Sequence, residues 1–495
     1  MQQCFMAVDL GTSYIKAGIY TAKGRCLSIV QEKVITEKED QGSYIQRGDM
    51  LFEKTLRCIR KSVLSFSGSA GWIEAVAFTG QMAGFMGVDE RWNDITSWSC
   101  SLDTRYLPYV ERLSDEDRNF IARSSGTCAP LMMPKIQWFQ TEFPKEAEKI
   151  SKYVMISSYI LGRMGECDIE EAVIDYSLLS WTGLGDIARR DWCGELCSRF
   201  GIDIHKLARI TAPDTVCGYL SKNMAIQTGL LQGTPLIIGA GDKVAGCVGS
   251  AITHQGDMIF EAASYGGFSC LVPDYRQSHR VGYYDGICCM EGILAHKYIP
   301  GSGITLNWFL EQMSDVRGKE GFTEMDKKAS AVGPGCEGLM AIGLLGGSAM
   351  PFDSAIKGMW MGFDWSHRQE HFYRSLLESY TFDLALTIDS IEESYEEIGG
   401  DRIVMTGGGA RSELWAQMIS DVTGKRVLRR SENDASLWGA VLIAQKALGV
   451  NKGARQEYEG EICHEPDLKM QSIYWPLKKR YENYRRELHD YFIGL

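Results

Sequence analysis

An acidic side chain interrupts an apolar run near the N-terminus, in the stretch FMAVDLGTSYIKAGIY. Asp9 ends a hydrophobic strand, where a carboxylate is costly unless it is solvated, paired or bound to a cation. The turn of Gly11, Thr12 and Ser13 groups backbone N–H donors with hydroxyls, which suits an anion such as phosphate. Lys16 could reach a terminal phosphate, and Asp9 could hold Mg²⁺ through water molecules. The alternative is an ordinary hairpin whose aspartate caps the turn.

A second carboxylate follows the apolar run TPLIIGAG. Asp242 lies between Gly241 and Lys243, where the pattern changes from a strand to a buried helix of small residues. A ligand can come close at such a glycine-flanked junction, and the helix N-terminus is expected to hold the pKa of Asp242 down. The alternative is that Asp242 is a helix N-cap. The spacing fits neither the dinucleotide fingerprint G-x-G-x-x-G nor a P-loop, since no Gly-Lys-Ser/Thr occurs.

Three further groups of residues could contact a ligand. Gln81 and Met82 follow the strand-like AFTG and could reach a sugar, although a polar residue there is often only part of a turn. Asp103 could bind hydroxyl groups with Arg105 orienting its carboxylate, and the alternative is a surface ion pair. The segment GGGARS, residues 407–412, joins a strand to a helix, so its backbone amides could line a nucleotide. Glycine turns of this kind are common, so this signal alone is weak.

The candidate residues require secondary structure that positions them. A looser copy of the opening hairpin, GDMIFEAASYGGFSCLV, runs strand, small-residue turn, strand in the second half of the chain. Turn formers mixed with polar residues near 250–255 predict a boundary between domains at 1–252 and 253–495. Apolar periodicity predicts strands over 5–8, 15–20, 23–35 and 73–80, the first three as an antiparallel meander, and helices over 50–64 and 436–449.

Composition limits the class of protein. A chain of 495 residues is too long for one ordinary core, and 45% hydrophobic with 23% charged residues is typical of a globular protein. The net charge of −12 argues against a nucleic acid or an anionic membrane as the main partner. The fifteen cysteines show no C-x-x-C spacing, and the first residues do not resemble a secretory signal. We expect a soluble cytoplasmic protein with free thiols.

Taken in order, the motifs resemble those of the FGGY carbohydrate kinases over nearly the whole chain. The matching segments are DLGTSYIK, TGQMAG, DTR, GAGDKVAGCVG, TGGGARSELWAQMISDVTG and SLWGAVLIA. Connecting segments agree too, among them DYSLLSWTGLGDIARRDW at 175–192. The resemblance implies an α/β fold of two RNase H-like domains, of the actin–hexokinase type, flanking a deep cleft that holds ATP and a sugar.

The resemblance also implies roles for individual residues. Asp9 is implied in Mg²⁺ binding, and Asp242 is implied as the general base and as a sugar contact. The implied contacts of the sugar also include Gln81, Met82, Ala83 and Asp103. The implied contacts of ATP are Gly11, Thr12, Ser13, Lys16, Ser264, Gly303, Gly408, Gly409 and Ser412. The family's second phosphate turn usually reads Gly-Thr-Ser, whereas this chain has Ala262-Ala263-Ser264.

The prediction is therefore an ATP-dependent kinase for a sugar or polyol, nearest to the xylulokinase-like branch, with Mg²⁺ and ATP as cofactors. Many members of that branch have Gln-Met-His where this chain has Gln81-Met82-Ala83, so a related acceptor is an alternative: an acyclic polyol, a modified sugar or a signalling sugar derivative. A second alternative is a non-catalytic, actin-like nucleotide-binding sensor or scaffold. The family often forms homodimers, which is an expectation for this chain as well.

Overall fold

The computed structural model describes residues 3–40, 42–264, 266–277, 284–299, 302–349, 352–353, 356–430, 434–450 and 461–493. This part of the chain forms two compact units. The first falls within Met1–Ala251, Gly286–Met290 and Asn433–Gln456, and the second within Ile252–Asp285, Glu291–Glu432 and Glu457–Leu495. The units interleave along the sequence, whereas the predicted domains, 1–252 and 253–495, are each continuous. Those domain limits stay a prediction.

A mixed six-stranded sheet forms the centre of the first unit. Its strands are β1 (Cys4–Leu10), β2 (Tyr14–Thr21), β3 (Cys26–Lys33), β5 (Ile73–Gly80), β13 (Val216–Tyr219) and β14 (Pro235–Gly241). They lie in the order β13-β14-β5-β1-β2-β3. The pairs β1–β2 and β2–β3 are antiparallel, which confirms the predicted meander. The pairs β1–β5 and β5–β14 are parallel, and β13 is antiparallel to β14.

The three parallel strands end at the same level of the sheet. Leu10 of β1 pairs with Gly80 of β5, and Gly80 pairs with Gly241 of β14. The residues next to these positions are Asp9, Gln81 and Asp242. Because the carboxyl ends of parallel strands share one edge, the pairing brings three candidate residues from distant parts of the sequence to that edge, where α/β sheets bind their ligands.

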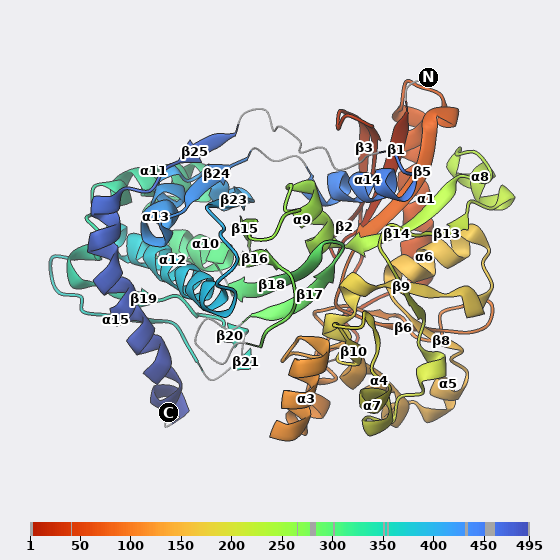
Figure 1. Cartoon of the computed structure of the whole chain (residues 1–495), viewed down its shortest axis with the longest axis horizontal. Coiled ribbons are helices and arrows are strands. Elements are labelled where there is room, and N and C mark those ends of the chain that lie inside the picture. Colours follow the sequence, from red (N-terminus) through yellow and green to blue (C-terminus); the bar gives the residue numbers. More distant parts are fainter. Residues whose placement is uncertain are drawn as a thin grey trace. The chain divides into compact units, whose positions relative to one another are not determined.

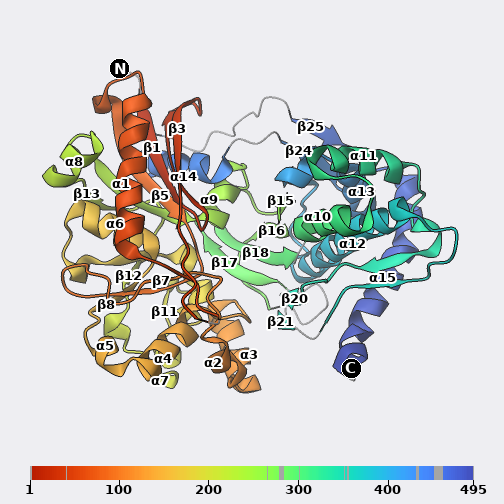
Figure 2. The ribbon, with the colours of Figure 1, turned by 180° about the vertical axis from the view of Figure 1, so that it is seen from behind.

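Helices cover both faces of this sheet. The helix α14 (Ala435–Ala447), drawn in blue, packs against β1, β5 and β14 on one face, beside α9 (Asp242–Gly249) (Figure 1). On the opposite face, α1 (Gly48–Ser65) packs against β2 and β3 (Figure 2). The apolar residues that α1 buries recur at helical spacing and are Leu51, Phe52, Leu56, Cys58 and Ile59.

Shorter elements complete the first unit. Its remaining helices are α2 (Leu107–Glu111), α3 (Asp115–Ser125), α4 (Met132–Glu142), α5 (Pro144–Glu148), α6 (Ile156–Gly165), α7 (Gly194–Arg199) and α8 (Lys222–Thr228). Its remaining strands are β4 (Ile45–Gln46), β6 (Met86–Val88), β7 (Trp98–Ser99), β8 (Lys152–Val154), β9 (Val173–Asp175), β10 (Gly185–Asp186), β11 (Asp191–Trp192) and β12 (Arg209–Thr211). A further strand, β17 (Asp285–Cys289), contains the point at which the chain passes between the units.

The sheet of the second unit has the same pattern of strand directions as the first, but its antiparallel edge strand comes last in the sequence, whereas β13 precedes β14 in the first unit. Its sheet contains β15 (Met258–Glu261), β16 (Gly266–Val272), β18 (Gly292–Ile299), β23 (Arg402–Thr406), β24 (Arg426–Arg429) and β25 (Ile462–His464). The order β18-β16-β15-β23-β24-β25 combines an antiparallel meander with parallel strands and an antiparallel edge strand. The predicted second hairpin is confirmed as β15 and β16. The two mixed sheets match the predicted fold class.

One buried helix organises the rest of the second unit. In α12 (Gln369–Ser394) most residues are buried, because the helix packs against β18 and against helices on several sides. Those helices are α10 (Ser302–Met313), α11 (Gly318–Ser330), α13 (Glu413–Thr423) and α15 (Leu468–Ile493). The remaining strands are β19 (Met340–Ile342), β20 (Ser348–Ala349), β21 (Phe352–Asp353) and β22 (Met359–Met361). Along the described ranges, every helix is too short or too polar to span a lipid bilayer.

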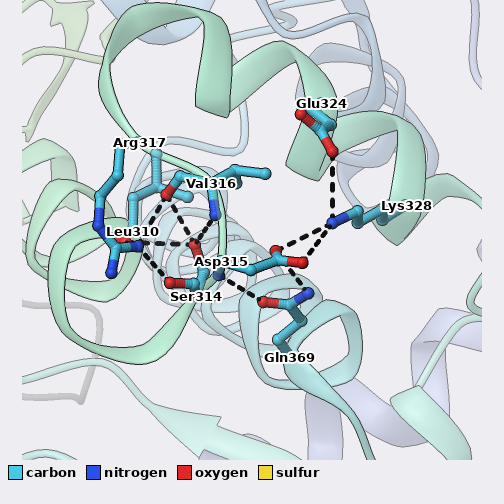
Figure 3. A network of polar contacts seen from close by, with 8 residues as sticks. All are labelled: Leu310, Ser314, Asp315, Val316, Arg317, Glu324, Lys328 and Gln369. Carbon is cyan, nitrogen blue, oxygen red and sulfur yellow. Dashed lines mark hydrogen bonds and ion pairs between the residues drawn. The ribbon is translucent and has the colours of Figure 1, made fainter.

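A polar network fixes the connection between α10 and α11 (Figure 3). Arg317 donates to the carbonyl oxygens of Leu310, Ser314 and Val316, which satisfies groups left open at the end of α10. Asp315 forms an ion pair with Lys328 at 3.0 Å and accepts a hydrogen bond from Gln369 at the start of α12. The network ties three helices together.

Candidate functional site

Asp9 is a buried carboxylate with an unused oxygen. Its Oδ1 has no hydrogen-bond partner among the described residues, and the residue is 9% exposed. Burial, followed by the negative charges of Asp242 and Asp434, raises the pKa of Asp9 to about 7 against the lowering effect of Lys16. An aspartate that capped the turn would accept backbone N–H groups, so the capping alternative does not describe Asp9.

These properties fit one ligand position of a magnesium ion. The described residues contain no cluster of three or more His, Cys, Asp or Glu side chains that could hold a metal. Mg²⁺ does not need such a cluster, because it retains several waters and is usually held by one or two carboxylates and the phosphates of a substrate. The free oxygen of Asp9 is therefore suited to the ion that the sequence predicts.

Lys16 faces Asp9 across the first hairpin and is held by a third acidic residue. Asp9 and Lys16 are paired in the register of β1 and β2. The ammonium Nζ of Lys16 lies 2.5 Å from Oδ2 of Asp434. Burial lowers the pKa of Lys16, but the hydrogen bond and charge of Asp434, together with the charge of Asp9, outweigh this effect and raise it.

Asp434 was missed by the sequence reasoning. It is the N-cap of α14, and its Oδ1 accepts a hydrogen bond from the backbone N–H of Leu437. An aspartate two positions before the helix predicted over 436–449 was a visible signal for a cap. Its partner Lys16 lies 418 positions away in the sequence, and nothing in the sequence around Asp434 indicates this pairing.

The predicted phosphate turn is open to solvent and is supported from behind. Gly11 and Thr12 are half-buried, and Ser13 is exposed. The side-chain amide of Gln46 donates hydrogen bonds to the carbonyl oxygen of Thr12 at 3.1 Å and to Oγ1 of Thr36 at 3.0 Å. Solvent can therefore reach the turn, while the hydrogen bond from Gln46 fixes the carbonyl group of Thr12.

Gln46 also connects this turn to the predicted sugar loop. Nε2 of Gln81 donates to Oε1 of Gln46 at 3.0 Å, and Oε1 of Gln81 accepts from Nε1 of Trp98 at 3.1 Å. Gln81 is buried and its amide already has two partners, so its contact with a sugar stays a prediction. Met82 is buried and Ala83 is half-buried in the same loop. Sequence reasoning missed Gln46, because a single glutamine in a loop carries no motif.

Asp103 forms a buried ion pair. Arg105 donates to Asp103 with both Nε, at 2.9 Å, and Nη2, at 2.6 Å, and Ser99 Oγ donates at 2.9 Å. Asp103 is 2% exposed, so the alternative of a surface ion pair is wrong, whereas the orienting role expected of Arg105 agrees with the geometry. Both oxygens of the carboxylate are used within the chain, and its contact with a sugar stays a prediction.

A buried lysine holds the loop that carries Asp103. Lys135 of α4 donates to the carbonyl oxygens of Ser99 at 3.1 Å and Cys100 at 2.6 Å, and it is 1% exposed. Burial lowers the pKa of Lys135 to about 8, although the negative charge of Asp103 acts in the opposite direction. The sequence signal for Lys135 was a lysine within the otherwise apolar segment MMPKIQWF.

Asp242 is the first residue of α9 and does not cap it. The N-cap position is Gly241, and Oδ1 of Asp242 accepts a hydrogen bond from the backbone N–H of Lys243 at 2.7 Å. Burial raises the pKa of Asp242 against the lowering effect of Lys243, so the expectation of a lowered pKa is wrong. The side chain is nevertheless exposed to solvent, which leaves it accessible to a substrate.

In the second unit, the predicted ATP contacts gather around the turn that follows β15. The N–H of Gly303 donates to the carbonyl oxygen of Ala263 at 3.1 Å, and the N–H of Gly409 donates to that of Ala262 at 2.8 Å. A Cβ atom at Gly303 would lie 2.5 Å from the Ala263 oxygen and 2.9 Å from the Cα of Ser264, so only glycine fits. Three distant segments therefore meet at the ends of the parallel strands β15 and β23.

The last two predicted contacts belong to the glycine turn before α13. A Cβ atom at Gly408 would meet no other atom within 4 Å, so its backbone is open to a ligand. Ser412 is the N-cap of α13 and accepts a hydrogen bond from the N–H of Trp415 at 3.0 Å.

Comparison with known protein families decides the class of protein. Residues 4–249 match the N-terminal domain, and residues 277–448 the C-terminal domain, of the FGGY family of carbohydrate kinases.

The chain belongs to the FGGY carbohydrate kinases.

Individual relatives of this kinase agree on the family and differ in substrate. A xylulose kinase of Bacillus subtilis is 23% identical over 492 residues, which cover 97% of this chain and 94% of the relative. A gluconokinase of the same species is 26% identical over 467 residues, covering 91% and 88%. The crystal structure of a gluconate kinase from Lactobacillus acidophilus superposes with a TM-score of 0.89 at 19% identity and covers both chains completely.

This FGGY kinase is therefore an ATP-dependent enzyme that acts on a carbohydrate. That result excludes the alternative of a non-catalytic, actin-like sensor or scaffold. The family match does not assign roles to individual residues, so the roles of the site residues stay predictions.

Proposed function

We propose that this kinase transfers the γ-phosphoryl group of ATP to a hydroxyl group of a sugar or polyol, with Asp242 as the general base. The observation that carries the proposal is the common level of Leu10, Gly80 and Gly241, which places Asp9 and Asp242 at one edge of the sheet. The negative charge of Asp242 raises the pKa of Asp9, which agrees with this placement of the two carboxylates.

The environment of Asp242 suits proton abstraction. Its Oδ1 is occupied by the N–H of Lys243, which fixes the carboxylate and leaves Oδ2 to receive the proton of the attacking hydroxyl. A raised pKa makes the carboxylate a stronger base, while its exposure lets an acceptor reach it. A positioned base of this kind contributes on the order of 10²–10⁴ in rate.

The first hairpin is proposed to receive the phosphates. Gly11, Thr12 and Ser13 offer exposed or half-exposed donors, and Lys16 supplies a positive charge that Asp434 holds in place. Asp9 would hold Mg²⁺, which neutralises negative charge on the phosphates when bound. Phosphoryl transfer depends mainly on such positioning and charge neutralisation, which these residues are arranged to provide.

The second unit is proposed to contact the remainder of the nucleotide at its own strand edge. The support is the convergence of the turn containing Ser264 with Gly303, Gly408 and Gly409. Ala263 lacks the hydroxyl that a threonine would offer there, so backbone N–H groups and Ser264 are the proposed donors. Ser412 is proposed to act through the N-terminus of α13, which its side chain caps.

The acceptor is proposed to be a sugar of the kind that xylulokinase-like enzymes phosphorylate. Met82, Ala83 and Asp103, with the supporting Gln81, would line the acceptor side. Ala83 cannot offer the hydrogen bond of the histidine found in many xylulokinases, which weakens the case for xylulose itself. The xylulose kinase and gluconokinase relatives have similar identities and do not favour one substrate. A polyol or modified sugar is the alternative acceptor.

A substrate screen tests the proposal. ADP release is coupled to a spectrophotometric signal and measured with ketoses, aldoses, alditols and aldonates, each with Mg²⁺ and ATP. One chemical class is expected to stimulate ADP release and to yield a phosphorylated product. ATP binding without stimulation by any of these compounds would contradict the proposed acceptor class. The expected cytoplasmic location and homodimeric state stay predictions, tested by cell fractionation and by light scattering.

A further inference from the structure

The strand that leads to Asp242, β14, ends irregularly. The parallel pairing of β14 with β5 shifts between Ile237 and Ala240, and Gly239 lies between them with a φ of +72°. A Cβ atom at Gly239 would be 1.6 Å from the carbonyl oxygen of Phe78, so the strand approaches its neighbour too closely for any side chain. The last residues of β14 therefore need support from outside a regular strand ladder.

A serine side chain provides part of that support. The backbone N–H of Gly241 donates to Oγ of Ser177 at 2.9 Å, and both residues are buried. Gly241 directly precedes Asp242, so this bond fixes the peptide from which α9 begins. Ser177 lies in the segment 175–192, to which the proposed function has given no role.

Ser177 is itself held by a buried carboxylate. Oδ1 of Asp175 accepts a hydrogen bond from the N–H of Ser177 at 2.9 Å and another from its hydroxyl. A serine hydroxyl has one donor and two acceptor positions. Since the donor points to Asp175, an acceptor position of Ser177 remains for the N–H of Gly241. Both Asp175 and Ser177 are 1% exposed, so solvent does not compete for these bonds.

We propose that Ser177, oriented by Asp175, is a positioning residue that sets the location of Asp242 relative to the acceptor hydroxyl. This inference rests on the proposed function of Asp242 as the general base. Neither Ser177 nor Asp175 touches the reacting groups; each acts through the peptide of Gly241. A displacement of about 1 Å at a catalytic group can cost on the order of 100-fold in rate, so a loosened peptide is expected to reduce turnover strongly.

The same segment offers a matched control. Ser180 is also 1% exposed, and its Oγ has no hydrogen-bond partner among the described residues. Ser180→Ala removes the same atom from the same kind of environment without touching Gly241. Ser177→Thr retains the hydroxyl. Asp175→Asn tests the hydrogen bond between the hydroxyl of Ser177 and the carboxylate of Asp175.

The experiment measures kcat and KM for ATP with the best acceptor from the substrate screen, on full-length variants with similar melting temperatures. Ser177→Ala is expected to lower kcat by roughly 10- to 100-fold while KM for ATP changes less than about two-fold, because the change acts on the base and not on the phosphate turn. Asp175→Asn is expected to lower kcat in the same direction. Ser177→Thr is expected to retain most of the activity, and Ser180→Ala nearly all of it.

Two outcomes separate this inference from the proposed function. If Ser177→Ala has the kcat of the unmodified enzyme while Asp242→Asn is inactive, the positioning role is wrong and the base role stands. If Ser177→Ala and Ser180→Ala lower kcat equally, the effect is one of packing and the positioning role is again wrong. Full activity of Asp242→Asn would overturn the proposed function and this inference together.

Discussion

The ammonium of Lys16 lies 2.5 Å from a carboxylate oxygen of Asp434, across a sequence separation of 418 residues. Their side chains are 29% and 19% exposed, so solvent screens the pair only in part. The contact joins the hairpin that contains the predicted phosphate turn to the N-terminus of α14. It also gives Lys16 a defined direction before any phosphate is bound.

Asp434→Asn is expected to weaken ATP binding. The substitution removes the charge that holds Lys16, so we expect KM for ATP to rise by roughly three- to ten-fold and the melting temperature to fall by a few degrees, as for the loss of a partly buried ion pair. Asp214→Asn is the control, because Asp214 pairs with Lys446 of the same helix at 3.8 Å. Equal KM values for the two variants would contradict the role of Asp434.

Gln46→Leu is expected to disturb the phosphate turn and the sugar loop together. The residue is fully buried, and the change leaves Nε2 of Gln81 and the carbonyl oxygen of Thr12 without their partner, at a cost of about 1–3 kcal/mol each. Thr36→Val is the control, since it removes only the third bond of Gln46. We expect kcat to fall clearly in Gln46→Leu alone, with a lower melting temperature. Normal kinetics in that variant would show that the two loops do not depend on Gln46.

Lys135 is expected to make stability rise with pH on the alkaline side. Its pKa is about 8 in the folded chain against 10.5 for an ordinary lysine, so the unfolded chain binds more protons between these values. Folding stability from this group therefore increases from about pH 8 to about pH 10.5, by up to about 3 kcal/mol. The charged or titratable neighbours are Asp103, Cys100 and Arg105.

Melting curves of the unmodified enzyme and Lys135→Met, recorded from pH 7 to pH 10, test this expectation. The variant lacks the ionisable group, so its melting temperature should fall more steeply with pH than that of the unmodified enzyme. Parallel pH profiles would contradict the lowered pKa of Lys135. The loss of the bonds to Ser99 and Cys100 affects the variant at every pH and does not change the comparison.

Gly439→Ala is expected to separate α14 from α9. A Cβ atom at Gly439 would lie 1.8 Å from the carbonyl oxygen of Ala245, so the helices must move apart. Overpacking of this kind costs about 1–3 kcal/mol or more, and we expect a melting temperature several degrees lower. Gly194→Ala is the control, because a Cβ atom there meets nothing within 4 Å. A variant Gly439→Ala as stable as Gly194→Ala would contradict the close packing.

Local patterns predicted the elements that carry the site. The opening hairpin follows from the alternation of apolar residues around the turn of Gly11, Thr12 and Ser13, and β5 begins and ends where its alternation predicts. The ordered motifs then gave the family. In each case the signal lies within a short window of sequence.

The supporting contacts could not be predicted in this way. The contacts of Asp434 with Lys16, of Gln46 with Thr12 and of Lys135 with Cys100 join residues 34 to 418 positions apart. No periodicity or motif marks such pairs. The pKa of Asp242 was expected in the wrong direction, because the sequence shows a helix N-terminus but not the desolvation that the folded chain imposes on this carboxylate. Long-range contacts and desolvation are properties of the folded chain.

The most direct test of the account is the turnover of Asp242→Asn, measured as acceptor-dependent ADP release beside a separate titration of nucleotide binding. The substitution keeps the shape of the side chain and removes its ability to take a proton. We expect turnover to fall on the order of 10²–10⁴-fold while the affinity for ATP stays within about three-fold of the unmodified enzyme. Turnover close to that of the unmodified enzyme would contradict the assignment of Asp242 as the general base.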